Sequence, residues 1–77
     1  MRVRVHHFAA LRETRGVEHE DVQISSGSTV GQLYRELFPG PERSMRVLFA
    51  VNQEYASADR ALEAGDEVAF IPPLGGG

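Results

Sequence analysis

Apolar and polar side chains alternate along the start of the chain, from Arg2 to Phe8. This alternation predicts a β-strand, because successive side chains of a strand point to opposite faces. Val3, Val5 and His7 would share one face, and Phe8 would lie on the other, charged face. The apolar run that begins at residue 8 predicts a short helical turn up to residue 15, and the glycine at position 16 ends it.

A second strand and a longer helix are expected next. Residues 18–24 carry the strand pattern, and the turn-rich segment before them predicts antiparallel pairing with the first strand. Thr29 precedes Gln32 by three residues, which is the spacing of a capping box at a helix start. The apolar face of this helix is formed by Val30, Leu33, Tyr34, Leu37 and Phe38. The Pro-Gly-Pro sequence at residues 39–41 ends the helix.

The second half of the chain is rich in strand patterns. Residues 46–51 are largely apolar, as expected of a strand at a central position in the sheet. Asn52-Gln53 predicts a tight turn into a short return strand at residues 54–56. Leu62 would anchor the next loop, and Gly65-Asp66 turns the chain into a last strand at residues 67–71.

The predicted order is therefore strand, strand, helix, strand, short strand, strand. One helix packed on one face of a small mixed sheet is the economical way to bury this apolar surface. The long connection through the helix allows the first and last strands to lie parallel in the middle. We therefore expect an α+β protein with the β-grasp, or ubiquitin-like, fold. Residues 1–73 would form its single domain, and residues 74–77 would form a flexible glycine tail.

Composition and charge narrow the possible chemistry. The 77 residues include no cysteine, which excludes a disulfide and a thiolate zinc site, and no lysine, which excludes conjugation to a lysine of this chain. The net charge is −3 and no basic run occurs, unlike in nucleic-acid binders. With no signal peptide and no apolar run long enough to span a bilayer, we expect a cytoplasmic protein without nucleic-acid or membrane partners.

The remaining polar residues suggest no metal site and no bound cofactor. His6 and His7 are adjacent, so they point to opposite faces of a strand, and His19 is isolated. All three are interpreted as surface histidines. The acidic residues of segment 18–21 are interpreted as a solvated strand edge that discourages aggregation.

The end of the chain carries the most information about function. Pro72-Pro73 favours an extended backbone that points away from the sheet. The three glycines after Leu74 have no side chains and can pass through a channel too narrow for other residues. A terminal carboxylate can attack the α-phosphate of ATP, and the resulting acyl-adenylate can accept sulfur to give a thiocarboxylate. Glycine-rich ends are often only frayed termini, so the position after a last strand is what favours a chemical role.

Three segments resemble one known family. They are residues 8–13 (FAALRE), 50–55 (AVNQEY) and 62–73 (LEAGDEVAFIPP). They resemble the corresponding blocks of the small subunits of molybdopterin synthase, which are ubiquitin-like sulfur carriers. The Gly-Asp-Glu-Val turn at residues 65–68 is also similar to that of related carriers, including the one of the thiamine pathway. The first two segments favour the molybdopterin family.

This resemblance implies a sulfur-transfer cycle. An ATP-dependent activating enzyme would adenylate the terminal glycine, and a sulfur donor would convert it to a thiocarboxylate. The tail, with Leu74 and Gly75 as partner-binding residues, would insert into the large subunit of molybdopterin synthase within a heterotetramer. Sulfur would pass to a cyclic pyranopterin precursor, so the chain is a sulfur donor that is not catalytic alone. The family typically ends in two glycines, which leaves either Gly77 or Gly76 as the reacting residue.

Two questions stay open from the residues alone. Phe8 is either a partner contact on the charged face of the first strand or a core residue, if the strand ends before it. The second question is the function. The leading hypothesis is a sulfur carrier for molybdopterin, and the alternatives are a carrier for thiamine synthesis or RNA thiolation, a ubiquitin-like protein modifier, or an interaction module whose tail is inert.

Overall fold

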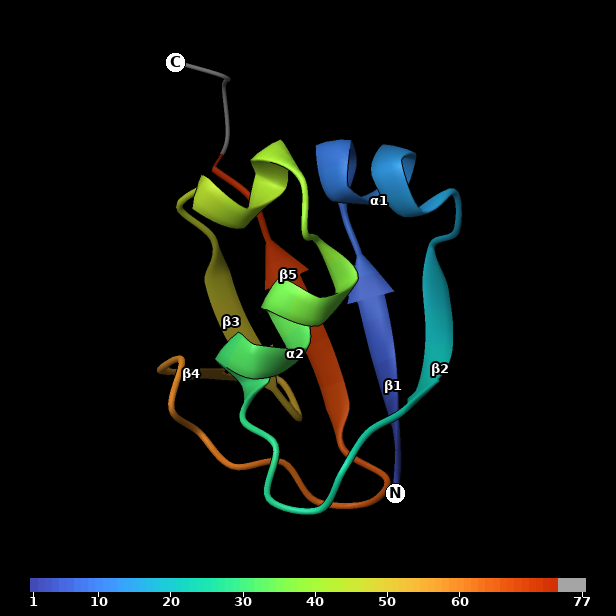
Figure 1. Cartoon of the computed structure of the whole chain (residues 1–77), viewed down its shortest axis with the longest axis vertical. Coiled ribbons are helices and arrows are strands. Elements are labelled where there is room, and N and C mark those ends of the chain that lie inside the picture. Colours follow the sequence, from blue (N-terminus) through green and yellow to red (C-terminus); the bar gives the residue numbers. More distant parts are fainter. Residues whose placement is uncertain (74–77) are drawn as a thin grey trace.

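The computed structural model describes residues 1–73 of the chain (Figure 1). Its elements follow the predicted order, with a short 3₁₀ turn, η1, added after the main helix. The elements are β1 (Arg2–His7), α1 (Ala9–Arg15), β2 (His19–Gln23), α2 (Val30–Leu37), η1 (Pro41–Ser44), β3 (Leu48–Val51), β4 (Glu54–Ala56) and β5 (Glu67–Ile71). Among these residues, no helix has the length and apolar character that crossing a bilayer requires.

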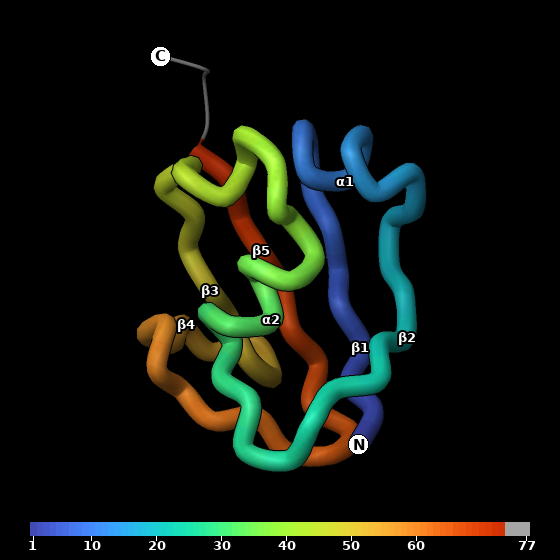
Figure 2. The backbone as a smooth tube through the Cα atoms, in the orientation of Figure 1, coloured from blue at the N-terminus to red at the C-terminus, as the bar shows by residue number. Residues whose placement is uncertain are grey.

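The five strands form one mixed sheet in the order β2-β1-β5-β3-β4. The central pair, β1 and β5, is parallel, and every other pair of neighbours is antiparallel. The main helix α2 lies across one face of the sheet, and α1 lies at the end where β1 finishes (Figure 1, Figure 2). This is the β-grasp fold, as predicted. β5 occupies the centre of the sheet, and β3 is interior beside it.

The core lies between the helices and the sheet face that they cover. Its largest fully buried side chains come from both helical and strand segments: Val3, Val5, Leu11, Val30, Leu33, Phe38, Val51, Val68 and Phe70. Leu62 is 3% exposed and holds the loop before β5 against this core, as predicted. Both helices therefore contribute to the same core.

The boundaries of α2 follow the sequence signals. The Thr29 hydroxyl accepts a hydrogen bond from the Gln32 backbone N–H at 3.2 Å, and the Gln32 side chain accepts one from the Thr29 N–H at 2.9 Å. This reciprocal pair is the predicted capping box. Beyond the helix, the Tyr34 hydroxyl donates to the Glu42 carbonyl, which ties η1 to α2. The sequence predicted no element at η1.

Left-handed backbone occurs at several turns, and two of them were predicted from the sequence. Gly16 ends α1 with φ of 78°, where a side chain would be strained. Asn52 and Gln53, with φ of 52° and 70°, form the predicted turn between β3 and β4. The Asn52 carboxamide donates to Asp66 at 3.0 Å and accepts from the Glu67 N–H at 2.9 Å. This turn is therefore fastened to the start of β5.

The interpretation of His7 as a surface residue is wrong. The alternation along β1 carries it to the covered face, where it is 2% exposed and packs against Phe38 and Phe70. Its Nε2 lies 2.7 Å from Glu20 Oε2, and Arg15 donates to both carboxylate oxygens of Glu20 at 2.8 Å. The interpretation of Glu20 as a solvated residue is therefore wrong too, although Asp21 on the edge strand β2 and Glu18 just before it are exposed.

The pKa values of His7, Glu20 and Arg15 are all shifted in this partly buried triad. The hydrogen bonds from Arg15 hold the pKa of Glu20 below its ordinary value, so its carboxylate is ionised and accepts only. Burial lowers the pKa of His7, although the hydrogen bond to Glu20 opposes this. His7 is therefore neutral and donates from Nε2. Its buried Nδ1 meets no hydrogen-bond partner among residues 1–73.

Candidate functional site: the open face of the sheet

The sheet face opposite the helices carries an exposed apolar surface, which we call the open face. Strand register brings its side chains into rows, because Ala69 pairs with both His6 and Ala50, and Ala50 pairs with Tyr55. A second row joins Leu48 to Ile71. Leu48 and Tyr55 are 56% and 76% exposed, and they adjoin other apolar side chains, so they form part of a patch. The side chains of this surface are Phe8, Leu48, Ala50, Tyr55, Ala69 and Ile71.

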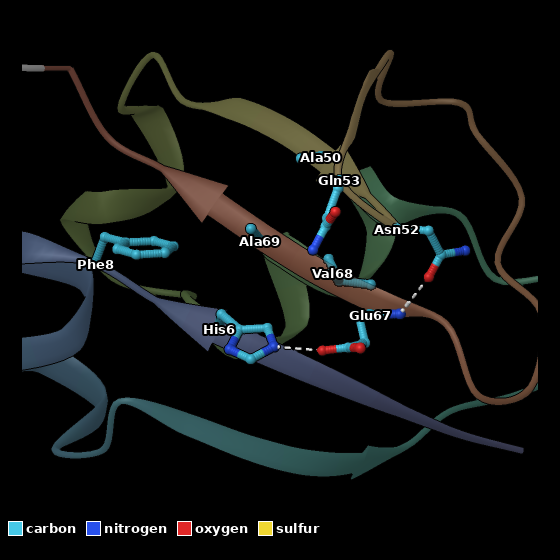
Figure 3. Close-up of a pocket in the computed structure, with 8 residues that line it drawn as sticks. All are labelled: His6, Phe8, Ala50, Asn52, Gln53, Glu67, Val68 and Ala69. Atoms are coloured by element: carbon cyan, nitrogen blue, oxygen red, sulfur yellow. Dashed lines mark hydrogen bonds and ion pairs between the residues drawn. The ribbon is translucent and has the colours of Figure 1, made fainter.

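A groove of about 410 Å³ runs along the open face (Figure 3). Its floor is low because two alanines, Ala50 and Ala69, lie side by side on neighbouring strands. Phe8 and Gln53 stand among the side chains that line it, together with His6, Asn52, Glu67 and Val68. The small residues of β3 and β5 thus create a depression that a partner's side chains can fill.

A smaller apolar groove of about 220 Å³ adjoins the first. It is lined by Phe8, Ala9, Ile71 and Pro72. Because β1 and β5 are parallel, the end of β5 lies beside the end of β1, and this brings residues 8 and 71 together. Phe8 lines both grooves, so they form one continuous apolar surface beside the point where the described chain ends.

The structure places Phe8 on the surface and not in the core. β1 ends at His7, and Phe8 is the residue that precedes α1, with its side chain 48% exposed. The strand therefore does end before Phe8, but the ring does not turn inward, because Leu11 of α1 fills the core instead. Its role as a partner contact stays a prediction, which this exposure supports.

The other predicted site residues, Leu74, Gly75, Gly76 and Gly77, lie outside the described residues. The structure follows the chain as far as Pro72, which is buried, and Pro73, which is exposed. Both come directly after the central strand β5. The predicted extended exit after the last strand therefore begins at the edge of the apolar surface around Phe8.

Charged residues border the open face on its β1–β2 side. Arg4 donates to Asp21 at 3.0 Å across the two strands, and this hydrogen bond lowers the pKa of Asp21. His6 lies 2.9 Å from Glu67 on β5. An apolar centre with a polar rim is the usual anatomy of a protein–protein interface. Among residues 1–73, no group of three or more acidic or histidine side chains could hold a metal ion.

The sequence analysis missed most of the open face. It did not single out Leu48, Ala50, Tyr55, Ala69 or Ile71. The alternation within residues 67–71 separates Ala69 and Ile71 from Val68 and Phe70, and this was the available signal. Both rows are apolar, so the strand alone does not tell which row the helix covers.

Comparison with known proteins settles the family. The sequence model that describes the ThiS family matches residues 5–77, which is nearly the whole chain. The chain belongs to the ThiS family. Two curated relatives are both named molybdopterin synthase sulfur carrier subunit. The one from Mycobacterium tuberculosis is 39% identical, over 100% of this chain and 99% of its own. The one from Chlamydomonas reinhardtii is 37% identical, over 100% of both chains.

Solved structures agree with this ThiS-family assignment. SAMP1 from Haloferax volcanii is 27% identical, with a TM-score of 0.79 over 100% of both chains. A second solved structure is the complex of subunits 1 and 2 of the molybdopterin-converting factor from Helicobacter pylori. This chain is similar to one chain of that complex, at 21% identity and a TM-score of 0.67, over 100% of both chains. These structures confirm the β-grasp fold, and the curated relatives confirm the resemblance to molybdopterin synthase small subunits.

Proposed function

We propose that this chain is the sulfur carrier subunit of a molybdopterin synthase, and that its C-terminal glycine carries the sulfur. The observation that supports this most is the exit of the chain from the central strand β5 beside the apolar surface around Phe8. The names of the full-length relatives point to the same role. The residues proposed to dock the partner thus lie on, or directly beside, the sheet whose central strand leads to the terminus.

The chemistry proceeds at the terminal carboxylate, in two exchanges. A carboxylate oxygen of Gly77 attacks the α-phosphorus of ATP, and pyrophosphate leaves. A sulfur nucleophile then attacks the acyl carbon, and AMP leaves with that oxygen, so the terminus becomes a thiocarboxylate. An ATP-dependent partner enzyme binds the nucleotide and supplies the catalytic groups, and its need for ATP fits a cytoplasmic location. This chain holds no cofactor in the scheme and is not catalytic alone.

The large subunit of the synthase is the second partner. The complex of the two subunits from Helicobacter pylori supports such a pairing, and the family resemblance suggests a heterotetramer. The large subunit covers the open face, with Phe8 as a central contact, and the tail enters the large subunit with Leu74 and Gly75 as contact residues. The four residues after Pro73 can span at most about 14 Å. The acceptor, a cyclic pyranopterin precursor, must therefore be bound within that distance of the edge of the interface.

Replacement of Phe8 tests the docking step. Phe8→Glu puts a charge at the junction of both grooves, and it should weaken binding to the large subunit by at least about tenfold, since interface energy concentrates in buried aromatic anchors. Isothermal titration calorimetry of the two purified subunits measures this. The control is Val17→Glu, because Val17 is also an exposed apolar residue, 41% exposed, and lies in the α1–β2 loop. Equal binding by the two variants would contradict the assignment of the open face.

Reconstitution tests the transfer step. The chain with a thiocarboxylate terminus, mixed with the large subunit and the pterin precursor, should form the dithiolene product, and the unmodified chain should not. Removal of Gly77 distinguishes the two possible termini. Loss of activity supports Gly77 as the reacting residue, whereas full activity assigns the reaction to Gly76. Formation of the product by the unmodified chain would refute the proposal.

A further inference from the structure

A third groove lies on the helical side of the molecule, away from the open face. It has a volume of about 230 Å³ and lies between α2, the segment around η1 and the start of β3. Three arginines from these three segments line it, together with an apolar floor. The lining residues that matter here are Arg35, Arg43, Arg46, Tyr34, Met45 and Phe49. We call it the arginine groove.

The three arginines have no carboxylate partner in the described part of the chain. Arg4, Arg12 and Arg15 each form an ion pair with an acidic residue of β2 or its approach, whereas Arg35, Arg43 and Arg46 form none with any residue from 1 to 73. Glu42, which precedes Arg43 in the sequence, accepts a hydrogen bond from the Thr14 hydroxyl at 2.8 Å, and Glu36, which follows Arg35, forms no ion pair with a residue from 1 to 73. In a chain with a net charge of −3, this is a local concentration of unneutralised positive charge.

The floor of the arginine groove is apolar and aromatic. Tyr34 is 3% exposed, and its ring meets Phe49 edge-on with centroids 5.8 Å apart. The Tyr34 hydroxyl is already used in the bond to the Glu42 carbonyl. Met45 and Phe49 are half-buried and pack against the core. A ligand must therefore offer apolar surface to the floor and oxyanions to the rim.

The groove also extends along α2. A neighbouring hollow of about 240 Å³ shares Gly31, Arg35 and Ala58 with it. The Gly31 N–H donates to the Ala58 carbonyl at 2.9 Å, and a Cβ at position 31 would lie 2.9 Å from that same oxygen. Glycine at position 31 thus lets α2 pack directly against the loop that carries Ala58, at the junction of the two hollows. Asp59 lines the far hollow, so an acidic ligand would place its carboxylates at the arginine end.

We propose that the arginine groove binds an acidic, partly apolar segment of a partner protein. Carboxylates would pair with the guanidinium groups, which are planar donors suited to bidentate bonds, and a leucine-like side chain would cover Tyr34 and Phe49. The shallow, elongated shape suits a peptide segment. Nucleic acid would require a longer basic surface than three arginines provide. Because the groove and the open face lie on opposite sides of the sheet, both can be occupied together.

Nuclear magnetic resonance titration tests this directly on the full chain. The probe is a synthetic peptide of alternating glutamate and leucine residues, added to ¹⁵N-labelled protein. We expect saturable shifts at the amides of Gly31, Arg35 and Phe49, and none at Ala69 on the open face. The triple variant R35Q/R43Q/R46Q should bind on the order of tenfold more weakly, and higher salt should weaken binding by the wild type.

Two controls make the result specific. The variant R2Q/R60Q removes exposed arginines outside the arginine groove, so it should bind like the wild type. A peptide of alternating glutamate and serine should bind more weakly, because it leaves the floor uncovered. The proposal is overturned if the triple variant binds as tightly as the wild type, if the shifts fall on the open face, or if inorganic phosphate alone matches the peptide in shifts and affinity. None of these outcomes bears on the sulfur chemistry of the terminus.

Discussion

The half-buried carboxylate of Glu20 should contribute more to stability than any other acidic side chain of β2. It accepts two hydrogen bonds from Arg15 and one from His7, each at 2.7–2.8 Å. Glu20→Gln keeps the size of the side chain but removes the charge. The new NH₂ group then faces the N–H donors of Arg15 and His7, so it cannot accept their hydrogen bonds. Hydrogen bonds to charged groups contribute about 1.5–3 kcal/mol each in stability. The Arg15 and Glu20 side chains are 30% and 22% exposed, so solvent screens part of this energy.

We therefore expect Glu20→Gln to lower the free energy of unfolding by about 2 kcal/mol. For a domain of this size, each kcal/mol changes the melting temperature by about 4–8 °C, so melting should fall by about 8–16 °C. Urea and thermal unfolding at pH 7, followed by circular dichroism, measure both quantities.

The matched control is Glu18→Gln. Glu18 also pairs with an arginine, Arg12, but at 3.4 Å and with 77% of its side chain exposed. An exposed pair contributes about 0–1 kcal/mol, so this variant should melt within a few degrees of the wild type. If Glu20→Gln and Glu18→Gln lose the same stability, the triad does not support the fold in the way its geometry indicates.

Three further predictions concern single positions. Because burial lowers the pKa of His7, the unfolded chain takes up the proton first as the pH falls below about 6.5, and the native state loses stability from there downward. His7→Phe should flatten the pH dependence of unfolding below about pH 6.5, and an unchanged slope would exclude His7 as its source. Gln53→Gly should stabilise the β3–β4 turn by about 0.5 kcal/mol, because left-handed backbone strains a glutamine more than a glycine; a lower urea midpoint would contradict this. Gly31→Ala should destabilise by about 1–3 kcal/mol, since the new Cβ would lie 2.9 Å from the Ala58 backbone oxygen, and wild-type stability would show that the loop yields freely.

Most of the fold was predictable because its signals are local. The capping box at Thr29 and the spacing of apolar residues in α2 each depend on a few neighbouring positions, and both are confirmed. The Asn52-Gln53 turn and the last strand, residues 67–71, are also where the sequence predicts them. The parallel central pair follows from the long connection between the first and last strands.

The surfaces were less predictable because distant segments build them. The alternation along β1 assigned His7 to the face of Val3 and Val5, but its partner Glu20 lies 13 residues away and is specified only by strand register. The open face requires knowledge of which side of the sheet α2 covers. The arginine groove collects its three arginines from a helix, a 3₁₀ turn and the approach to a strand. No sequence periodicity connects such positions.

Intact-mass spectrometry of the full chain addresses the proposed carrier function without any assumption about the docking surface. The chain is incubated with the ATP-dependent activating enzyme, ATP and a sulfur source, and fragmentation then locates any modification. The proposal predicts a mass gain equal to one oxygen-to-sulfur exchange, confined to the terminal glycine and absent without ATP. A chain that never gains this mass, or that gains it at another residue, would contradict the proposal that its C-terminal glycine carries sulfur.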